Sequence, residues 1–173
     1  MADEAQIAEL TEKMTSERQK LLSALESLSE EDATRSPKDG EWTAKQQMSH
    51  LCEMETAYRA WVERAIEEDG ANVDGVRGER VAIPLEEADS RTVREHTGEM
   101  RRQREKTMAL IASMNPVDFE RRASNSLFGS LTVMQWLRSY YRHDRMHVDQ
   151  IGGHEPTYKP QFATGAEPDQ RRG

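Results

Sequence analysis

The sequence predicts an all-α protein, a four-helix bundle with a long connection between its second and third helices. Apolar residues recur every three to four positions in four separate stretches, and segments rich in glycine and proline separate them. Hydrophobic residues make up 35% of the chain and charged residues 32%, so a core can form only if each helix gathers its apolar residues on one face. A length of 173 residues suits one domain. We expect the bundle over residues 1–154 and an extended polar tail over residues 155–173.

The first two helices have clear boundaries in the sequence. Residues 5–28 repeat apolar side chains at helical spacing, which predicts an amphipathic helix. The segment 29–42 contains Pro37 and Gly40 and is expected to be a turn-rich connection. Thr43, with Gln46 three residues later, forms a capping-box pattern, so we expect the second helix to begin there and to end near residue 68.

The third and fourth helices follow a connection of about 20 residues, 69–89, which is rich in glycine. A connection of this length can travel back along a bundle, so the second and third helices can run in the same direction. The third helix is expected over 91–114, before Asn115-Pro116, and the fourth over 131–151, before Gly152-Gly153.

Composition excludes several classes of function. The formal net charge of −8 disfavours binding to nucleic acid or to an anionic membrane surface. No apolar run approaches the roughly 20 residues of a membrane span, and no signal-peptide pattern is present. Cys52 is the single cysteine, so no intrachain disulfide can form. We therefore expect a cytoplasmic protein whose partner is a small molecule.

Three histidines are predicted to converge on one divalent metal ion. His143 and His147 are four residues apart, so they share a helix face, and that face is the apolar one. His50 lies at the edge of the buried arc of the second helix. If the second and fourth helices are antiparallel, a rise of about 1.5 Å per residue places all three at nearly the same depth. Imidazole ligands suit zinc, nickel, copper and iron alike.

Two further residues are candidates for catalysis. Glu53 follows His50 by one turn and could orient a ligand or accept a proton, although it could equally be a surface charge. Gln150 follows His147 by one turn and could bond a bound water or a helix carbonyl. Position alone does not separate these roles.

Other polar residues near the histidines have two interpretations each. Asp144 and Asp149 could bond the distal imidazole nitrogens, or they could be solvated on the helix surface. His96 could reach the level of His50, but hydrogen-bonded packing is the simpler expectation. Cys52 lies roughly 200° around the helix from His50, so it is interpreted as a packing residue.

These motifs resemble those of the DinB/YfiT-like four-helix-bundle proteins. That family has a Trp at the start of the second helix, a His-Leu about eight residues later, and H-x-x-x-H-x-x-Q-I in the last helix. The corresponding residues here are Trp42, His50-Leu51, His143, His147 and Gln150-Ile151. The resemblance extends over about residues 5–153.

The resemblance implies an up-down-down-up bundle, commonly a homodimer, with zinc or nickel on His50, His143 and His147. It favours a thiol-dependent S-transferase or isomerase that acts on a small electrophile through a metal-bound thiolate. The cofactor of such an enzyme is a low-molecular-weight thiol such as bacillithiol, mycothiol or glutathione. Two alternatives stay open. One is a metal-dependent hydrolase of a small amide or ester, in which the activated group is water. The other is a non-catalytic metal-binding bundle.

Overall fold

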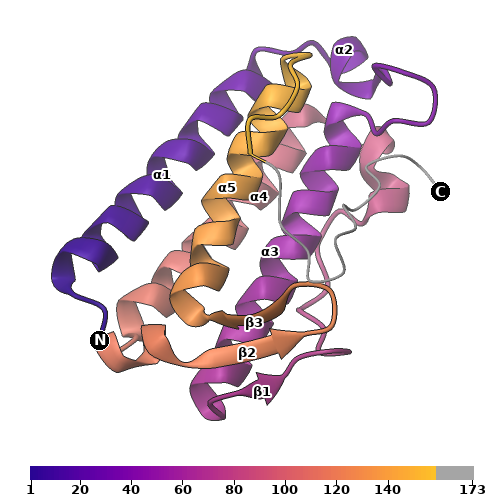
Figure 1. The fold of residues 1–173 in the computed structure, drawn as a ribbon. Coiled ribbons are helices and arrows are strands. Elements are labelled where there is room, and N and C mark those ends of the chain that lie inside the picture. The colour runs from indigo at the N-terminus through magenta and orange to yellow at the C-terminus, as the bar shows by residue number, and fades with distance from the viewer. Residues whose placement is uncertain (159–173) are drawn as a thin grey trace.

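Four long helices make up most of the molecule, as the sequence predicts (Figure 1). The computed structural model describes residues 1–158, so most of the predicted tail lies outside the described residues. Each long helix begins with a capping box. The side chain of the cap residue accepts a hydrogen bond from the backbone amide of the third helical residue, and the side chain of that third residue accepts one from the backbone amide of the cap. The helices are α1 (Glu4–Glu26), α3 (Ala44–Glu67), α4 (Val93–Ser113) and α5 (Val133–Ile151), capped by Asp3, Thr43, Thr92 and Thr132.

Side-chain contacts fix the relative directions of the helices. The Thr43 hydroxyl, just before α3, donates to Asp89 at 2.6 Å, just before α4. Further along both helices, Arg59 of α3 donates to the Gln103 carbonyl of α4 at 3.1 Å. These two helices therefore run in the same direction, and the long connection returns the chain to the end where α3 began (Figure 1). The end of α5 lies beside the beginning of α3, so that pair is antiparallel.

The all-α prediction is incomplete, because a small sheet closes one end of the bundle (Figure 1). Strand β1 (Ala71–Asn72) pairs in parallel with β2 (Arg122–Asn125), which pairs antiparallel with β3 (Gly129–Thr132). Ala71 is opposite Ala123 in the first pair. Strands of two and four residues are too short to show alternation, and β1 and β2 lie far apart in the sequence, so periodicity could not reveal them.

Three short helical segments also occupy stretches that were expected to be irregular. The segment between the first two long helices contains α2 (Glu30–Thr34), capped by Ser29, whose hydroxyl accepts from the Asp32 amide. The 3-10 helices η1 (Leu85–Ser90) and η2 (Pro116–Glu120) lie directly before α4 and after it. Within residues 1–158, no helix is both long enough and apolar enough to cross a lipid bilayer.

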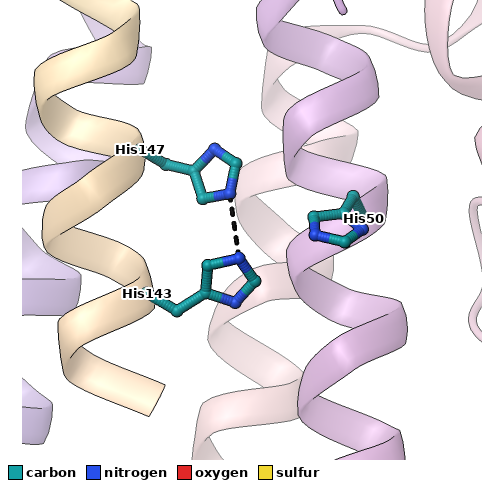
Figure 2. Close-up of side chains that lie close together, drawn as sticks. All are labelled: His50, His143 and His147. Carbon is teal, nitrogen blue, oxygen red and sulfur yellow. Dashed lines mark hydrogen bonds between the residues drawn. The ribbon is translucent and has the colours of Figure 1, made fainter. Parts of the chain in front are cut away.

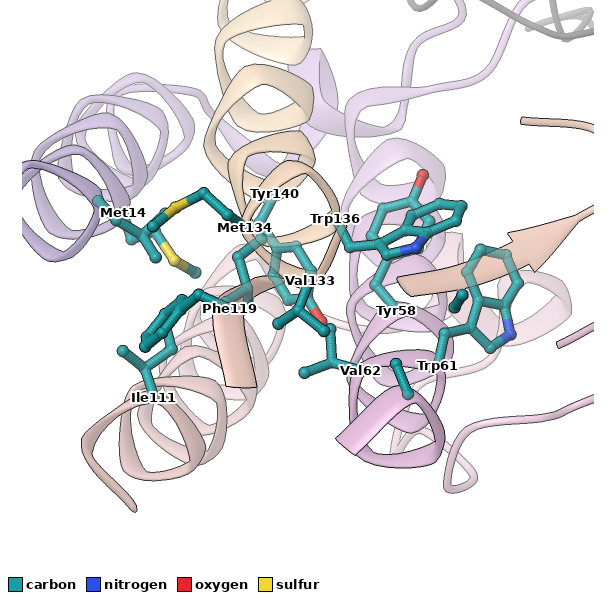
Figure 3. Packing of buried hydrophobic residues seen from close by; sticks show 14 of the residues in the cluster. Met14, Tyr58, Trp61, Val62, Ile111, Phe119, Val133, Met134, Trp136 and Tyr140 are labelled. Carbon is teal, nitrogen blue, oxygen red and sulfur yellow. The ribbon is translucent and has the colours of Figure 1, made fainter. Parts of the chain in front are cut away.

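The hydrophobic core has two parts. Near the sheet, aromatic side chains from α3 and α5 pack together (Figure 3), with ring centroids 5.2 Å apart for Trp61 and Trp136 and 5.4 Å apart for Tyr58 and Tyr140. Toward the other end the core is mainly aliphatic, and Met48 is completely buried there. The loss of water contact by both parts is the main force that holds the bundle together.

A buried ion cluster lies between these two parts of the core. Each long helix contributes one charged residue to it: Arg18 from α1, Glu55 from α3, Arg104 from α4 and Asp144 from α5. Arg18 bonds Glu55 at 2.6 Å and Asp144 at 3.0 Å, and Arg104 bonds the same two carboxylates at 2.8 Å each. None of the four residues is more than 7% exposed.

The cluster also satisfies its remaining hydrogen-bonding groups. Arg18 donates to the Met100 carbonyl at 2.9 Å, Arg104 donates to the Met14 carbonyl, and the Thr107 hydroxyl donates to Glu55 at 2.8 Å. Although burial alone would raise the pKa of Glu55, the two guanidinium groups lower it to about 2. The two positive and two negative charges compensate each other inside the protein.

We predict that Glu55→Gln lowers the free energy of unfolding by about 3–5 kcal/mol, because it leaves a buried positive charge without compensation. Urea unfolding at pH 7 measures this change. Glu67→Gln is the matched control, since Glu67 is exposed and pairs with Arg64 on the surface; its effect should stay within about 0.5 kcal/mol. Equal losses in the two variants would contradict a special role for the buried cluster.

Candidate metal centre

Three imidazoles meet where the beginning of α3 lies beside the end of α5 (Figure 2). His50 comes from α3, and His143 and His147 come from α5. One nitrogen of each ring lies within 4.8 Å of the others. The Nε2 atoms of His143 and His147 are 3.1 Å apart, and the ring centroid of His50 is 5.2 Å from that of His143 and 5.8 Å from that of His147. The structure thus brings together the three histidines that the sequence singled out.

The donor set fits a divalent ion. Two imidazole nitrogens that bind one tetrahedral zinc ion at about 2.0–2.1 Å are roughly 3.3 Å from each other. The separation between His143 and His147 is already close to that value. Three imidazoles leave further coordination positions for other ligands, which is the arrangement of catalytic rather than structural zinc sites.

Gln47 fixes the orientation of His147. Its amide oxygen lies 2.8 Å from Nδ1 of His147, while its amide NH2 donates to the Trp42 carbonyl at 3.5 Å. With the amide oxygen facing the ring, Nδ1 carries the proton and donates it, so the lone pair on Nε2 points into the histidine cluster. Gln47 was not among the sequence candidates. Its position one turn before His50, in the first turn of an inward-facing helix, was the available signal.

Trp42 positions the third imidazole. Its ring lies against His50, with centroids 4.7 Å apart and planes tilted by 48°. The residue directly precedes the Thr43 cap, so the start of α3 fixes both its backbone carbonyl and its ring. Trp42 therefore restrains two of the three histidines, His50 through its ring and His147 through Gln47.

Burial keeps the three imidazoles neutral. It lowers the pKa of His50 to about 3, with a further contribution from His143, and it lowers the pKa of His143 to about 4. The pKa of His147, which is completely buried, is lowered well below its usual value for the same reason. Since only neutral imidazole binds a metal, protons compete little with an ion near pH 7. His50 and His143 are half-buried, whereas His147 is completely buried.

The two proposed catalytic residues differ in their surroundings. The Glu53 carboxylate accepts a hydrogen bond from the Leu85 amide at 3.3 Å, which ties it to the long connection, and burial raises its pKa. Among residues 1–158, it does not belong to the group of close ligand atoms that the histidines form. The side-chain oxygen of Gln150 is buried without a hydrogen-bond partner in that part of the chain.

The remaining polar candidates have structural roles. Asp144 was expected either to bond an imidazole or to be solvated, and both interpretations are wrong, because it is buried between Arg18 and Arg104. Asp149 accepts from the Thr157 amide at 3.1 Å and so holds the segment after α5. The expected packing role of His96 is confirmed by its bond to the Ala88 carbonyl at 2.8 Å.

Cys52 is a packing residue, as expected. It lies in the aliphatic part of the core at 3% exposure. Burial raises the pKa of its thiol well above the usual range, so the thiol stays protonated and unreactive.

Comparison with known proteins identifies the family. The profile of the DinB superfamily matches residues 13–151, and the chain belongs to that superfamily. The uncharacterized protein YuaE of Bacillus subtilis (strain 168) is 24% identical over 140 residues, which cover 73% of this chain and 85% of YuaE. The structure is similar to that of YfiT from Bacillus subtilis, described as a probable metal-dependent hydrolase with an unusual four-helix bundle topology. The TM-score is 0.72 at 16% identity, covering 88% of this chain and 87% of YfiT. At that identity the likeness shows a shared fold.

We predict that in Gln47→Leu the Nδ1–H tautomer of His147 is no longer dominant. Imidazole nitrogen NMR spectra detect this change of tautomer. The free energy of unfolding should fall by about 1–3 kcal/mol, because a buried donor loses its acceptor. Gln47→Glu keeps an acceptor and should keep the tautomer. Gln19→Leu, on the exposed face of α1, is the surface control and should change neither quantity. An unchanged tautomer in Gln47→Leu would show that this contact does not orient the ring.

Proposed function

We propose that His50, His143 and His147 bind one divalent metal ion, zinc or nickel, and that the protein is a metal-dependent enzyme acting on a small molecule. The main support for this proposal is the convergence of three neutral imidazoles, whose nearest nitrogen atoms lie within 4.8 Å of one another. The description of YfiT, a relative in fold, as a probable metal-dependent hydrolase supports the same class of activity. The dimeric state and the cytoplasmic location stay predictions.

A divalent ion held by three protein ligands supplies a Lewis acid that lowers the pKa of a coordinated thiol or water. The residues of the chain have distinct parts in this proposal. His147 closes the inner side of the site, because it is completely buried, whereas the half-buried His50 and His143 leave an approach for substrate. The Trp42 ring beside His50 offers an apolar surface at that approach.

Glu53 and Gln150 remain the proposed catalytic residues. The raised pKa of Glu53 moves this carboxylate toward the range in which it can accept a proton and release it again near neutral pH. The buried and unpartnered oxygen of Gln150 can accept a hydrogen bond from a ligand or substrate. Both roles require the substrate to lie between α3 and α5, at the end of the bundle where the histidines meet.

Two nucleophiles are compatible with this site. A low-molecular-weight thiol would give the S-transferase or isomerase that the family resemblance favours. Water would give a hydrolase of a small amide or ester, which the description of YfiT favours. The neutral donor set serves both, because it leaves the positive charge of the ion uncompensated by ligands.

We predict that the protein, purified without an affinity tag, carries about one divalent ion per chain, because three neutral imidazoles form a preoriented site. Elemental analysis measures the ion. His143→Ala and His147→Ala should each abolish binding while circular dichroism still shows the helices. His154→Ala is the control, since that residue is exposed and lies after α5. Full metal retention in both α5 variants would exclude the site.

The choice of nucleophile can be tested with the cobalt-substituted protein. Bacillithiol, mycothiol, glutathione and coenzyme A are titrated in turn, and a thiol cofactor should add a sulfur-to-cobalt charge-transfer band in the near ultraviolet. The band should disappear in His50→Ala and persist in Cys52→Ala, because the Cys52 thiol is buried and protonated. If no thiol changes the spectrum while esters or amides are hydrolysed, water is the nucleophile. If no thiol changes the spectrum and no ester or amide is hydrolysed, the protein is a non-catalytic metal-binding bundle.

A further inference from the structure

A cavity of about 10 Å³ is lined both by His143 of the histidine cluster and by the buried ion cluster. All four charged residues of the ion cluster line it, together with His143 and Tyr140. This volume accommodates roughly one water molecule, and a buried water typically makes about three hydrogen bonds. The walls are polar enough to supply them, so the cavity differs from the dry apolar gaps found in hydrophobic cores.

The hydroxyl of Tyr140 is one polar group in these walls whose bonding is incomplete. Tyr140 lies on α5, one turn before His143, and is 3% exposed. Its hydroxyl is buried and has no hydrogen-bond partner in the part of the chain that the structure describes. The ring extends from α5 toward α3 (Figure 3). A buried phenol without a partner costs free energy, so a partner inside the cavity is expected.

His143 also lines this cavity, and its ring carries a second nitrogen. Its Nε2 atom faces His147, and its other ring nitrogen points away from His147 (Figure 2). When Nε2 serves as the ligand atom, Nδ1 carries the proton and needs an acceptor. Because His143 lines the cavity, an acceptor there would complete its bonding.

We infer that this cavity is a binding site for one ordered water molecule that joins the Tyr140 hydroxyl, the His143 imidazole and the Glu55 carboxylate. The water accepts a hydrogen bond from Nδ1 of His143 and donates one to Glu55. Its third bond is to the Tyr140 hydroxyl, so it has the three partners that are usual for a buried water. Glu55 is itself held by two guanidinium groups and cannot move away.

This water makes Tyr140 a positioning residue for the proposed metal site, a consequence that rests on the proposed function. Gln47 restrains the distal nitrogen of His147, and the water would restrain that of His143 in the same way. Such outer contacts fix ring orientation, and losing one typically weakens metal binding about 10–100-fold. The ion cluster would then support the ligands as well as the core.

High-resolution crystal structures of the wild type and of Tyr140→Phe test the water directly, with or without metal. The wild type should show one ordered water within hydrogen-bonding distance of the Tyr140 hydroxyl and of His143, and the variant should lose it or hold it weakly. An empty wild-type cavity overturns the inference. So does a Tyr140 hydroxyl bonded directly to Glu55.

Cobalt titration tests the positioning role. Tyr140→Phe should lower cobalt affinity about 10-fold and shift the visible cobalt bands, because the His143 ring is less restrained. Tyr141→Phe is the matched control: it removes a phenol oxygen from the next residue of α5, outside the cavity wall, and should behave as the wild type. Unchanged affinity and spectrum in Tyr140→Phe would reject the positioning role. If the wild type binds no cobalt, the proposed function fails, and the crystal structures still decide whether the water is present.

Discussion

The compensation of four buried charges is the constraint on which this bundle depends. Each long helix contributes one of these charges: Arg18, Glu55, Arg104 and Asp144. Each arginine is bonded to both carboxylates, and each carboxylate to both arginines. If one helix slid by a turn, at least one charge would stay buried without a partner, at a cost of several kcal/mol. Hydrophobic contacts alone tolerate such slides much better, because they are not directional. The ion cluster therefore sets the register of all four helices.

That register also places the candidate metal centre. Asp144 directly follows His143, so fixing the carboxylate between two arginines sets both the depth and the rotation of α5 around its axis. Glu55 has the same effect on α3, five residues after His50. The imidazoles meet because the buried ion cluster holds α3 and α5, the two helices that carry them, in a fixed register. Within that register, Gln47 orients the ring of His147, and Trp42 orients the ring of His50.

The sequence predicted the four helices and the convergence of the histidines because both follow from helical periodicity and capping. It did not predict the sheet, because strands of two and four residues are too short to show alternation and β1 pairs with a strand far away in the sequence. It also misplaced Asp144, because periodicity assigns charged residues to the outside of a helix. A charge can be buried only when its partners are known, and here they come from three other helices. Gln47 was missed for a related reason, since its role depends on a residue 100 positions away.

The burial of the histidines disfavours positive charge, but a proton and a metal ion differ in how many bonds they gain in return. Burial disfavours an isolated imidazolium, which is why the pKa values of His50 and His143 are low and the rings stay neutral. The same burial would disfavour a dication, but an ion gains a bond from each of three nitrogens, whereas a proton binds one. This difference favours the proposed binding of a cation that can use all three rings at once. Weak screening in such surroundings would also strengthen the effect of that charge on any group coordinated beside it.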